Sequence, residues 1–184
     1  MKKFTQNLIF IAIILLLLTS CGKSSINNSA SEKEPVNETV YEISLYYPTK
    51  EFVVNGDENY KFASIRTTVN DIDEIKDELE KLKVSPKTAT NSDGKETDVF
   101  AAIPKKITIN NIELHESIFT VDLNSKNLEG GSLDEQILIG SIVNTLKSVK
   151  ENNTPVSNSV KFTVDGKDVQ TLMGHFDVTE PIEE

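Results

Sequence analysis

The chain has 184 residues, a formal net charge of −10 and a single cysteine, Cys21. This length accommodates one domain, or two very small ones, and is short for a multidomain enzyme. One cysteine excludes an internal disulfide framework and a cysteine-ligated zinc cluster, and two histidines, His115 and His175, leave little for a histidine metal site. Nucleic-acid binding needs clustered lysine and arginine. Because the chain is acidic and Arg66 is its only arginine, we expect no nucleic-acid partner.

Residues 1–20 have the pattern of a secretory signal peptide. Lys2 and Lys3 form the basic end, and Leu8–Leu18 is an unbroken apolar run of eleven residues. That run makes about 16 Å of helix at 1.5 Å per residue, whereas crossing a bilayer needs roughly 20 apolar residues. The segment is therefore typical of a signal peptide more than of a permanent membrane span.

The leader ends in Leu18-Thr19-Ser20-Cys21, which resembles a bacterial lipobox. A lipobox implies cleavage before the cysteine and acylation of Cys21, with palmitate among the acyl chains, and two chains give stable attachment to a membrane. We expect a lipid anchor at the extracytoplasmic face of the cell membrane, followed by a disordered polar tether over residues 21–39. The alternatives are a plain secreted protein and an uncleaved anchor in which Cys21 is incidental.

The predicted folded domain spans residues 40–181 and begins with strands. Alternation predicts strands at 41–47, 52–54 and 62–69, with a turn at Asn55-Gly56 between the last two. Apolar residues at spacings of three and four predict a helix over 71–83. Residues 88–98 contain no large apolar residue, which indicates a polar loop.

The second half of the domain repeats this order of strands and one helix. Apolar runs predict strands at 99–103, 107–109, 112–114, 119–123 and 160–164. Asn110-Asn111 fits a hairpin turn or a bulge, and Asp165-Gly166 fits a hairpin turn.

A long apolar stripe predicts a second helix over 132–149. We expect Ser132 and Glu135 to form its capping box, and Gly140 and Ser141 to approach a sheet closely. We expect residues 177–184 to fray, with 182–184 as a flexible tail. The predicted fold is α+β, a single domain with a mixed or mainly antiparallel sheet and two main helices packed on one face.

Five stretches, in this order, resemble the GerMN domain of sporulation and germination proteins. They are Ile103-Pro104, Phe119-Thr120-Val121-Asp122-Leu123-Asn124, the helix Ile137 to Leu146, the segment Val160 to Lys167 with its Val-Asp-Gly-Lys turn, and Gly174 to Pro181. The resemblance covers roughly residues 41–181 and is strongest after Ile103. This chain departs from the family at Val84-Ser85-Pro86, in the longer polar loop 88–98, and at His115-Glu116-Ser117. The resemblance implies an envelope lipoprotein with a structural or assembly role, in sporulation or in another process, and it transfers no catalytic residues.

The sequence offers no clear catalytic, cofactor or metal site, so we expect a protein that is not an enzyme. Gly130-Gly131-Ser132 lacks the Gly-x-Ser-x-Gly pattern of a serine nucleophile. The acids at the start of the first helix lack the EF-hand series, and Asn91, Asp93 and Glu96 are a weak calcium candidate.

Two residues remain as candidates for an interaction surface. Tyr46 must face away from Tyr41 and Tyr47 on the same strand, and tyrosine is favoured at interfaces. Asp122 ends a strand, where an internal hydrogen bond is the simpler expectation. We therefore expect a membrane-anchored envelope lipoprotein that binds other envelope proteins or scaffolds an assembly; the alternative is a solute- or cell-wall-binding lipoprotein. A small-molecule ligand is not the favoured partner.

Overall fold

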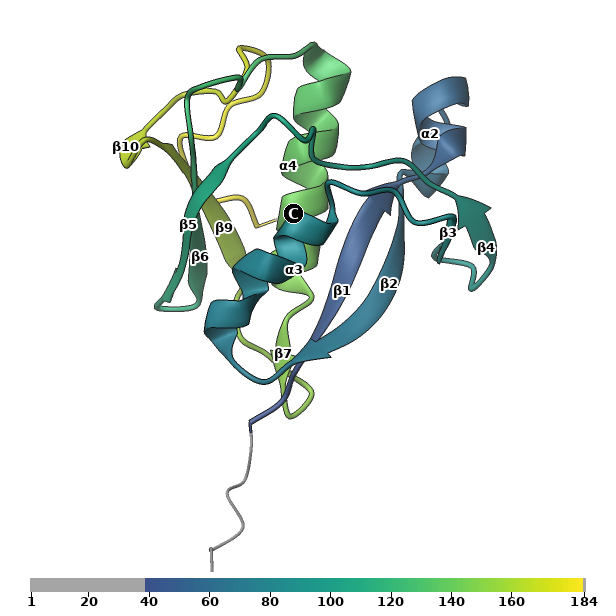
Figure 1. The fold of residues 1–184 in the computed structure, drawn as a ribbon, viewed down its shortest axis with the longest axis horizontal. Coiled ribbons are helices and arrows are strands. Elements are labelled where there is room, and N and C mark those ends of the chain that lie inside the picture. Colours follow the sequence, from purple (N-terminus) through teal and green to yellow (C-terminus); the bar gives the residue numbers. More distant parts are fainter. Residues whose placement is uncertain (1–38, 184) are drawn as a thin grey trace, which may run out of the picture. The chain divides into compact units, whose positions relative to one another are not determined.

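The computed structural model describes residues 39–183, in which strands form two sheets around a central helix (Figure 1). The six-stranded sheet has the order β4-β3-β2-β1-β7-β8 and the four-stranded sheet the order β10-β9-β6-β5. All strand pairs are antiparallel except β6 with β9. The α+β class and the mainly antiparallel pairing are thus confirmed, with the strands divided between two sheets.

The elements have the following bounds. The first sheet contains β1 (Tyr41–Pro48), β2 (Phe62–Val69), β3 (Thr88–Thr90), β4 (Glu96–Asp98), β7 (Lys150–Glu151) and β8 (Thr154–Pro155). The second contains β5 (Ile109–His115), β6 (Ile118–Leu123), β9 (Ser159–Val164) and β10 (Lys167–Asp168). The helices are α2 (Lys50–Asn55), α3 (Ile75–Lys81) and α4 (Ser132–Lys147), with 3-10 turns η2 (Glu58–Tyr60) and η3 (Ile72–Glu74).

One hydrophobic core joins the two sheets and the helices. Helix α4 contacts β1 of the first sheet and β9 of the second, and it stands between the sheets in Figure 1. Its Leu138, Ile142 and Leu146 are fully buried, because the apolar stripe faces protein along its whole length. Each such side chain contributes about 1.5–3 kcal/mol by leaving water. The wide stripe in the sequence therefore identified the central element correctly.

The predicted close approach at Gly140 is confirmed. A Cβ atom added at Gly140 would lie 2.6 Å from the ring of Phe62 on β2. The Phe62 ring in turn lies 6.3 Å from the ring of Phe52, centroid to centroid. Glycine at this position lets an aromatic ring pack directly on the helix backbone.

The predicted strand at 52–54 is wrong, because these residues lie in helix α2. Thr49 caps the helix by accepting a hydrogen bond at Oγ1 from the N–H of Phe52 (3.1 Å), and Gly56 ends it with φ of +69°. A run of three apolar residues fits a short helix as well as a strand. The threonine before it and the glycine after it are helix-terminating signals that decide the outcome.

The predicted polar loop at 88–98 is also wrong, because it contains the hairpin β3–β4. Asn91 holds the turn through Oδ1, which accepts hydrogen bonds from the N–H groups of Asp93 and Lys95. Ala89 is buried, whereas Thr90 and Glu96 are exposed. A hairpin with one small buried residue has no apolar alternation for a sequence pattern to detect.

Residues 99–103 do not form the predicted strand. Val99 makes a single bridge to Thr49. The N–H groups of Ala102 and Ile103 donate to the carbonyl of Leu82, just after α3. These apolar residues are buried by closing the end of a helix instead of by joining a sheet.

The structure decides between the two alternatives for Asn110-Asn111 and confirms the predicted Asp165-Gly166 turn. Asn110 and Asn111 form a bulge within a continuous strand β5, not a hairpin turn. Asp165 and Gly166, both with positive φ, make the predicted tight turn between β9 and β10.

The start of α4 and the end of the domain differ from expectation. Gly131, not Ser132, is the N-cap, and its N–H donates to Asp134 Oδ2 at 2.9 Å. The expectation that residues 177–184 fray is wrong for Val178, which is buried, and for Ile182, which exchanges two backbone hydrogen bonds with Val160.

Some expectations concern residues outside the described range. The leader 1–20, the lipobox, Cys21 and nearly all of the tether fall there and stay predictions. Among residues 39–183, no helix combines the length and apolar character needed to cross a membrane.

Candidate functional site

One face of the six-stranded sheet, here called the outer face, carries mostly polar side chains. Residues directly opposite each other in an antiparallel pair point to the same face. The register pairs Ser44 with Arg66 and Tyr46 with Ser64, so these four side chains share the outer face. The opposite face carries buried residues of β1, namely Ile43, Leu45 and Tyr47. The sheet is therefore two-sided, with an apolar inner face and a polar outer face.

A shallow hollow of about 680 Å³ lies on this outer face. We call it the Tyr46–Arg66 hollow; its polar lining includes Glu42, Ser44, Tyr46, Arg66, Thr68, Ser148, Lys150 and Asn153. A second open hollow of about 660 Å³ adjoins it, shares Arg66 and is walled by the β3–β4 hairpin. The prediction that Tyr46 faces away from the core is consistent with its place here, where it is half-buried.

The charge of the Tyr46–Arg66 hollow is opposite in sign to that of the whole chain. Arg66 and Lys150 carry positive charge there and Glu42 carries negative charge, within a chain of formal charge −10. Neither Arg66 nor Lys150 forms an ion pair with another residue of the 39–183 region. The hollow is therefore a small basic area on an acidic protein, and its two cations are not neutralised by any other residue of the described range.

Helix α4 fixes the strand that presents Tyr46. The N–H of Ser44 donates to Ser148 Oγ at 2.8 Å, and the N–H of Tyr46 donates to Thr145 Oγ1 at 3.0 Å. At the end of the same strand, the carbonyl of Pro48 accepts from the N–H of Phe100 at 3.0 Å. These bonds satisfy the edge of β1 that faces away from β2 beyond its short pairing with β7 at Tyr41 and Glu42, so the rest of that edge is closed to another strand. The strand is held on both sides, and its outward side chains lie on a rigid base.

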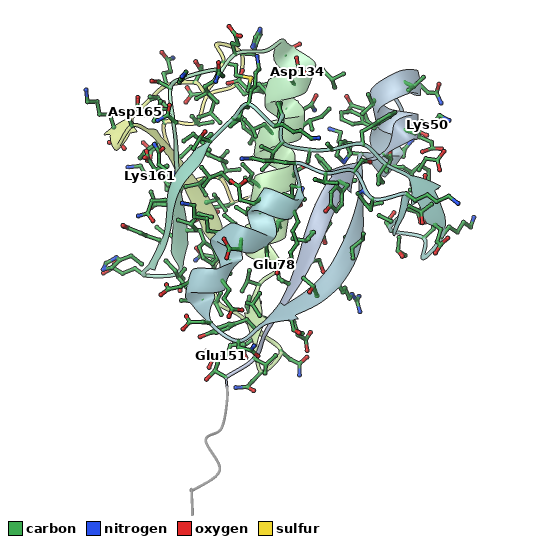
Figure 2. The ribbon with its side chains drawn as sticks, in the orientation of Figure 1. Lys50, Glu78, Asp134, Glu151, Lys161 and Asp165 are labelled. Carbon is green, nitrogen blue, oxygen red and sulfur yellow. The ribbon has the colours of Figure 1, made fainter. Side chains whose placement is uncertain are left out.

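The second candidate, Asp122, has its carboxylate occupied by internal hydrogen bonds. Its Oδ1 accepts from Thr163 Oγ1 at 2.8 Å and from the N–H of Gly166 at 2.7 Å, and its Oδ2 accepts from Asn110 Nδ2 at 2.9 Å. Asp122 thus joins the β5 bulge, β9 and the β9–β10 turn, at the corner marked by Asp165 in Figure 2. The structure brings Asp122 and Tyr46 onto different sheets, not into one site.

The environment of Asp122 lowers the pKa of its carboxyl group. Partial burial alone raises this pKa, but the hydrogen bonds from Gly166, Asn110 and Thr163 favour the ionised form and outweigh burial. The carboxylate is thus stabilised by the bonds that it makes inside the domain. The role of Asp122 is therefore to stabilise the fold, as the expectation of an internal hydrogen bond implied.

Glu135 is a buried carboxylate that the sequence interpretation assigned to the wrong role. It is fully buried, and Oε1 accepts from the N–H groups of Leu172 (2.8 Å) and Met173 (2.7 Å). Its Oε2 accepts from the N–H of His175 at 2.8 Å and lies 3.0 Å from His175 Nδ1. Glu135 therefore anchors the segment after β10 to α4. The sequence did contain a signal for this role. Glu135 precedes Leu138 by three residues and Ile142 by seven, which places it on the buried stripe of the helix.

The pKa of Glu135 is also lowered. Burial raises it, but the N–H groups of Met173, His175 and Leu172 and the His175 ring together lower it further than burial raises it. The buried carboxylate is thus ionised at neutral pH because four donors surround it.

The other residues considered for chemistry have ordinary structural places. Ser132 is exposed in the first turn of α4, and His115 is exposed at the end of β5. Asn91 organises the β3–β4 turn, and Asp93 accepts a hydrogen bond from the Tyr60 hydroxyl at 2.9 Å. Within the described part of the chain, no three acidic, cysteine or histidine residues gather in a way that suits a metal ion.

One comparison with known proteins identifies the family of this chain. A family model, Germane, described as sporulation and spore germination, matches residues 44–170. A Clostridium perfringens protein of known crystal structure, described as a candidate lipoprotein, is 18% identical with a TM-score of 0.46, covering 87% of this chain and 93% of that one.

The tandem GerMN domains of the sporulation protein GerM from Bacillus subtilis are 17% identical with a TM-score of 0.45. That likeness covers 89% of this chain and 48% of the tandem structure, so this chain spans about half of its length. No curated protein sequence matches the chain.

Proposed function

This chain belongs to the Germane family of sporulation and spore germination, and from that membership we propose that it is a lipid-anchored envelope protein whose domain binds another protein without catalysis. The observation that carries the proposal is the Tyr46–Arg66 hollow, a polar face with Tyr46 on the rigidly held strand β1 and Arg66 on the neighbouring β2, where Arg66 forms no ion pair with another residue of 39–183. Tyrosine and arginine are enriched where proteins bind one another.

The shape and chemistry of the hollow favour protein binding over capture of a small solute. Sites for small ligands are concave, mostly apolar and enclose most of the ligand. The Tyr46–Arg66 hollow is instead open and lined by hydroxyl and charged groups. Because Arg66 and Lys150 outnumber Glu42 there, the complementary partner surface is acidic.

The proposed absence of catalysis rests on the roles of the candidate groups. Glu135 and His175 pair with each other and with the backbone, and Asp122 accepts hydrogen bonds from three partners within the domain. These groups stabilise the fold, and none of them lines the Tyr46–Arg66 hollow.

Site-specific cross-linking in intact cells tests the binding face. A photo-reactive amino acid replaces Tyr46 in one strain and Lys126, an exposed loop residue outside both hollows, in a matched control. We expect one discrete protein adduct from position 46, none from position 126, and loss of the adduct when Arg66→Glu is added. Equal adducts from both positions, or only glycan or solute at position 46, would contradict the proposal; the second result favours the cell-wall- or solute-binding alternative.

The lipid anchor is tested separately. Support for it comes from the basic and apolar leader that ends in Leu18-Thr19-Ser20-Cys21. We expect Cys21→Ala to accumulate as unprocessed precursor and to lose labelling by an alkyne-bearing palmitate analogue, with Cys21→Ser as the conservative comparison. A Cys21→Ala protein that is processed and labelled like the wild type would refute the anchor.

A further inference from the structure

A second surface, distinct from the outer face, combines an apolar cleft with an open strand edge. We call it the β5 cleft; its volume is about 520 Å³, and its apolar lining is Tyr41, Ile72, Ile112, Leu114, Phe119 and Val156. Tyr41 at the start of β1 and Glu151 on β7 are among the residues that line it. In Figure 1 the start of β1 and the strand β7 lie at the same end of the domain. Elements from both sheets border it, so it is the open end of the core between them.

The apolar residues of the β5 cleft are covered incompletely. Phe119 forms a buried floor at 1% exposure. Ile72, Ile112 and Leu114 pack against the core but are only half-buried. Each such side chain gains free energy when a further apolar group covers it, at about 25 cal/mol per Å² removed from water. The cleft therefore offers apolar contact that the described part of the chain does not use.

The strand beside this cleft, β5, packs against α3 at its start, where Lys76 Nζ donates to the carbonyl of Asn110, but its edge is unpaired further along. β5 is the outermost strand of its sheet. A two-residue turn, Glu116-Ser117, joins it to β6, with φ of 49° and 64°. In such a hairpin the flanking pair His115 and Ile118 is hydrogen-bonded and the pairs then alternate. The backbone groups of Ile112 and Leu114 consequently point away from β6, and no other hydrogen bond among residues 39–183 uses them.

Negative charge surrounds the β5 cleft. Asp73, Glu113 and Glu151 line it, with His115 as the basic exception, and none of the three acids forms an ion pair with another described residue. Glu151 is labelled at this end of the molecule in Figure 2. The pKa of Tyr41 is raised by burial and then by the charges of Glu151 and Asp71, which is the effect expected of a negative potential.

We propose that the β5 cleft binds an extended segment of a partner protein, which adds as a strand to β5 and alternates apolar with basic residues. Successive side chains of a strand point to opposite faces. The apolar set would cover Ile112 and Leu114, while lysine or arginine side chains would reach Asp73 and Glu113. A second copy of this chain is a poorer occupant, because each copy carries a charge of −10. The proposal rests on β5 and does not depend on the Tyr46–Arg66 hollow.

Binding of a synthetic strand tests the proposal. The probe is the fluorescein-labelled peptide Lys-Val-Lys-Val-Lys-Val-Lys, measured by anisotropy with the full-length protein in non-ionic detergent at low salt, and with detergent alone as blank. We expect saturable binding that weakens at least tenfold when Asp73→Lys and Glu113→Lys are combined. The matched control, Glu96→Lys with Glu180→Lys, makes the same charge change at exposed acids outside the cleft and should leave affinity within about threefold.

Two further measurements separate strand addition from simple charge attraction. A peptide N-methylated at alternate amides keeps its charge but loses its edge donors, and we expect at least tenfold weaker binding. When the peptide is added to the wild-type protein, the NMR chemical shifts of the backbone amides should change most at Ile112 and Leu114 and not at Arg66. This measurement needs no variant, so it tests the proposal even if a variant fails to fold. Equal binding of the methylated peptide, equal loss in both charge variants, or no saturable binding would overturn the proposal. So would a dimer of the protein that the peptide dissociates, because the occupant would then be a second copy.

Discussion

Removing the carboxylate of Glu135 is expected to release the C-terminal segment from α4. Glu135 is fully buried and accepts from the N–H groups of Leu172, Met173 and His175 and from the His175 ring. In Glu135→Ala, the N–H of Leu172 has lost its acceptor inside a buried site. The other donors can be rehydrated only if the segment moves outward.

The magnitude follows from these bonds. Hydrogen bonds to a charged group contribute about 1.5–3 kcal/mol each, but such contributions are not additive within one cluster. Because detachment returns the donors to water, we expect Glu135→Ala to lower the free energy of unfolding by about 3–5 kcal/mol. Glu135→Gln keeps one carbonyl acceptor for Leu172 and Met173 and loses the charge. Glu135→Gln should therefore lower the free energy of unfolding by about half as much as Glu135→Ala.

Urea unfolding of the full-length protein, followed by circular dichroism, measures both variants. Hydrogen exchange locates the effect, which should appear first at the amides of Leu172, Met173 and His175. Thr179→Ala, at an exposed site in the same segment, is the control and should change stability by less than about 0.5 kcal/mol.

The pH dependence gives an independent check, because the folded-state pKa of Glu135 is lowered from its ordinary value of 4.5. Its stabilising contribution is therefore complete above the unfolded-state pKa and is lost as the pH falls through the folded-state pKa. The stability difference between wild type and Glu135→Ala should be constant above about pH 5.5 and shrink in acid. A cost below 1 kcal/mol, or a difference that grows in acid, would refute the assignment of Glu135 as the anchor.

Three further changes follow from the fold. Gly140→Ala places a Cβ 2.6 Å from the Phe62 ring and should lower the free energy of unfolding in urea by about 1–3 kcal/mol. Adding Phe62→Leu should restore part of that loss, because the smaller side chain removes the close contact. Asp122→Ala should lower the free energy of unfolding by about 2–4 kcal/mol at neutral pH, and this difference should shrink as the pH falls below the ordinary value of 3.8, because the pKa of Asp122 is lowered; a difference that grows in acid contradicts this. Thr145→Val should cost about 1–2 kcal/mol and speed exchange of the Tyr46 amide, whereas Thr120→Val should leave that amide unchanged.

The long periodic elements could be predicted from the sequence because burial decides them. The stripe of α4 and the alternation of β1 and β6 each follow one face that lies against the core. The Asp165-Gly166 turn was predictable for a different reason, since its backbone requires two positive φ values and few residue pairs adopt them. In these cases the local preference and the tertiary structure agree.

The short elements could not be predicted because their stability comes from single contacts. Helix α2 depends on the Thr49 cap and on Gly56, and a propensity pattern gives these less weight than the apolar run between them. The β3–β4 hairpin depends on the Asn91 side chain and on one pair between Ser64 and Thr90. A pattern of apolar residues contains no information on either interaction.

The candidate site was predictable only in part, for a related reason. Tyr46 followed from alternation, because a strand with buried neighbours must turn that residue outward. Arg66 and Lys150 join it only through the pairing of β2 and β7 with β1, which the sequence does not state. Glu135 was assigned to a capping box because its spacing from Ser132 fits one, while Asp134 makes that contact instead.

Side-chain acceptors account for which surfaces of the domain stay open. Thr145 and Ser148 close the outer edge of β1, and Glu135 closes the N–H groups that follow β10. Among residues 39–183, the edge of β5 receives one side-chain hydrogen bond, which Lys76 Nζ donates to the carbonyl of Asn110 at 2.8 Å, beyond the residues that line the β5 cleft. Exposed edges invite pairing with other strands, and proteins commonly block them. The outermost strands are β4, β5, β8 and β10, and β5 is the longest of them with 7 residues, so it offers the longest edge for strand addition. We therefore expect Leu114→Pro to abolish peptide binding, because it removes a backbone donor on this edge, and Leu114→Thr only to weaken it.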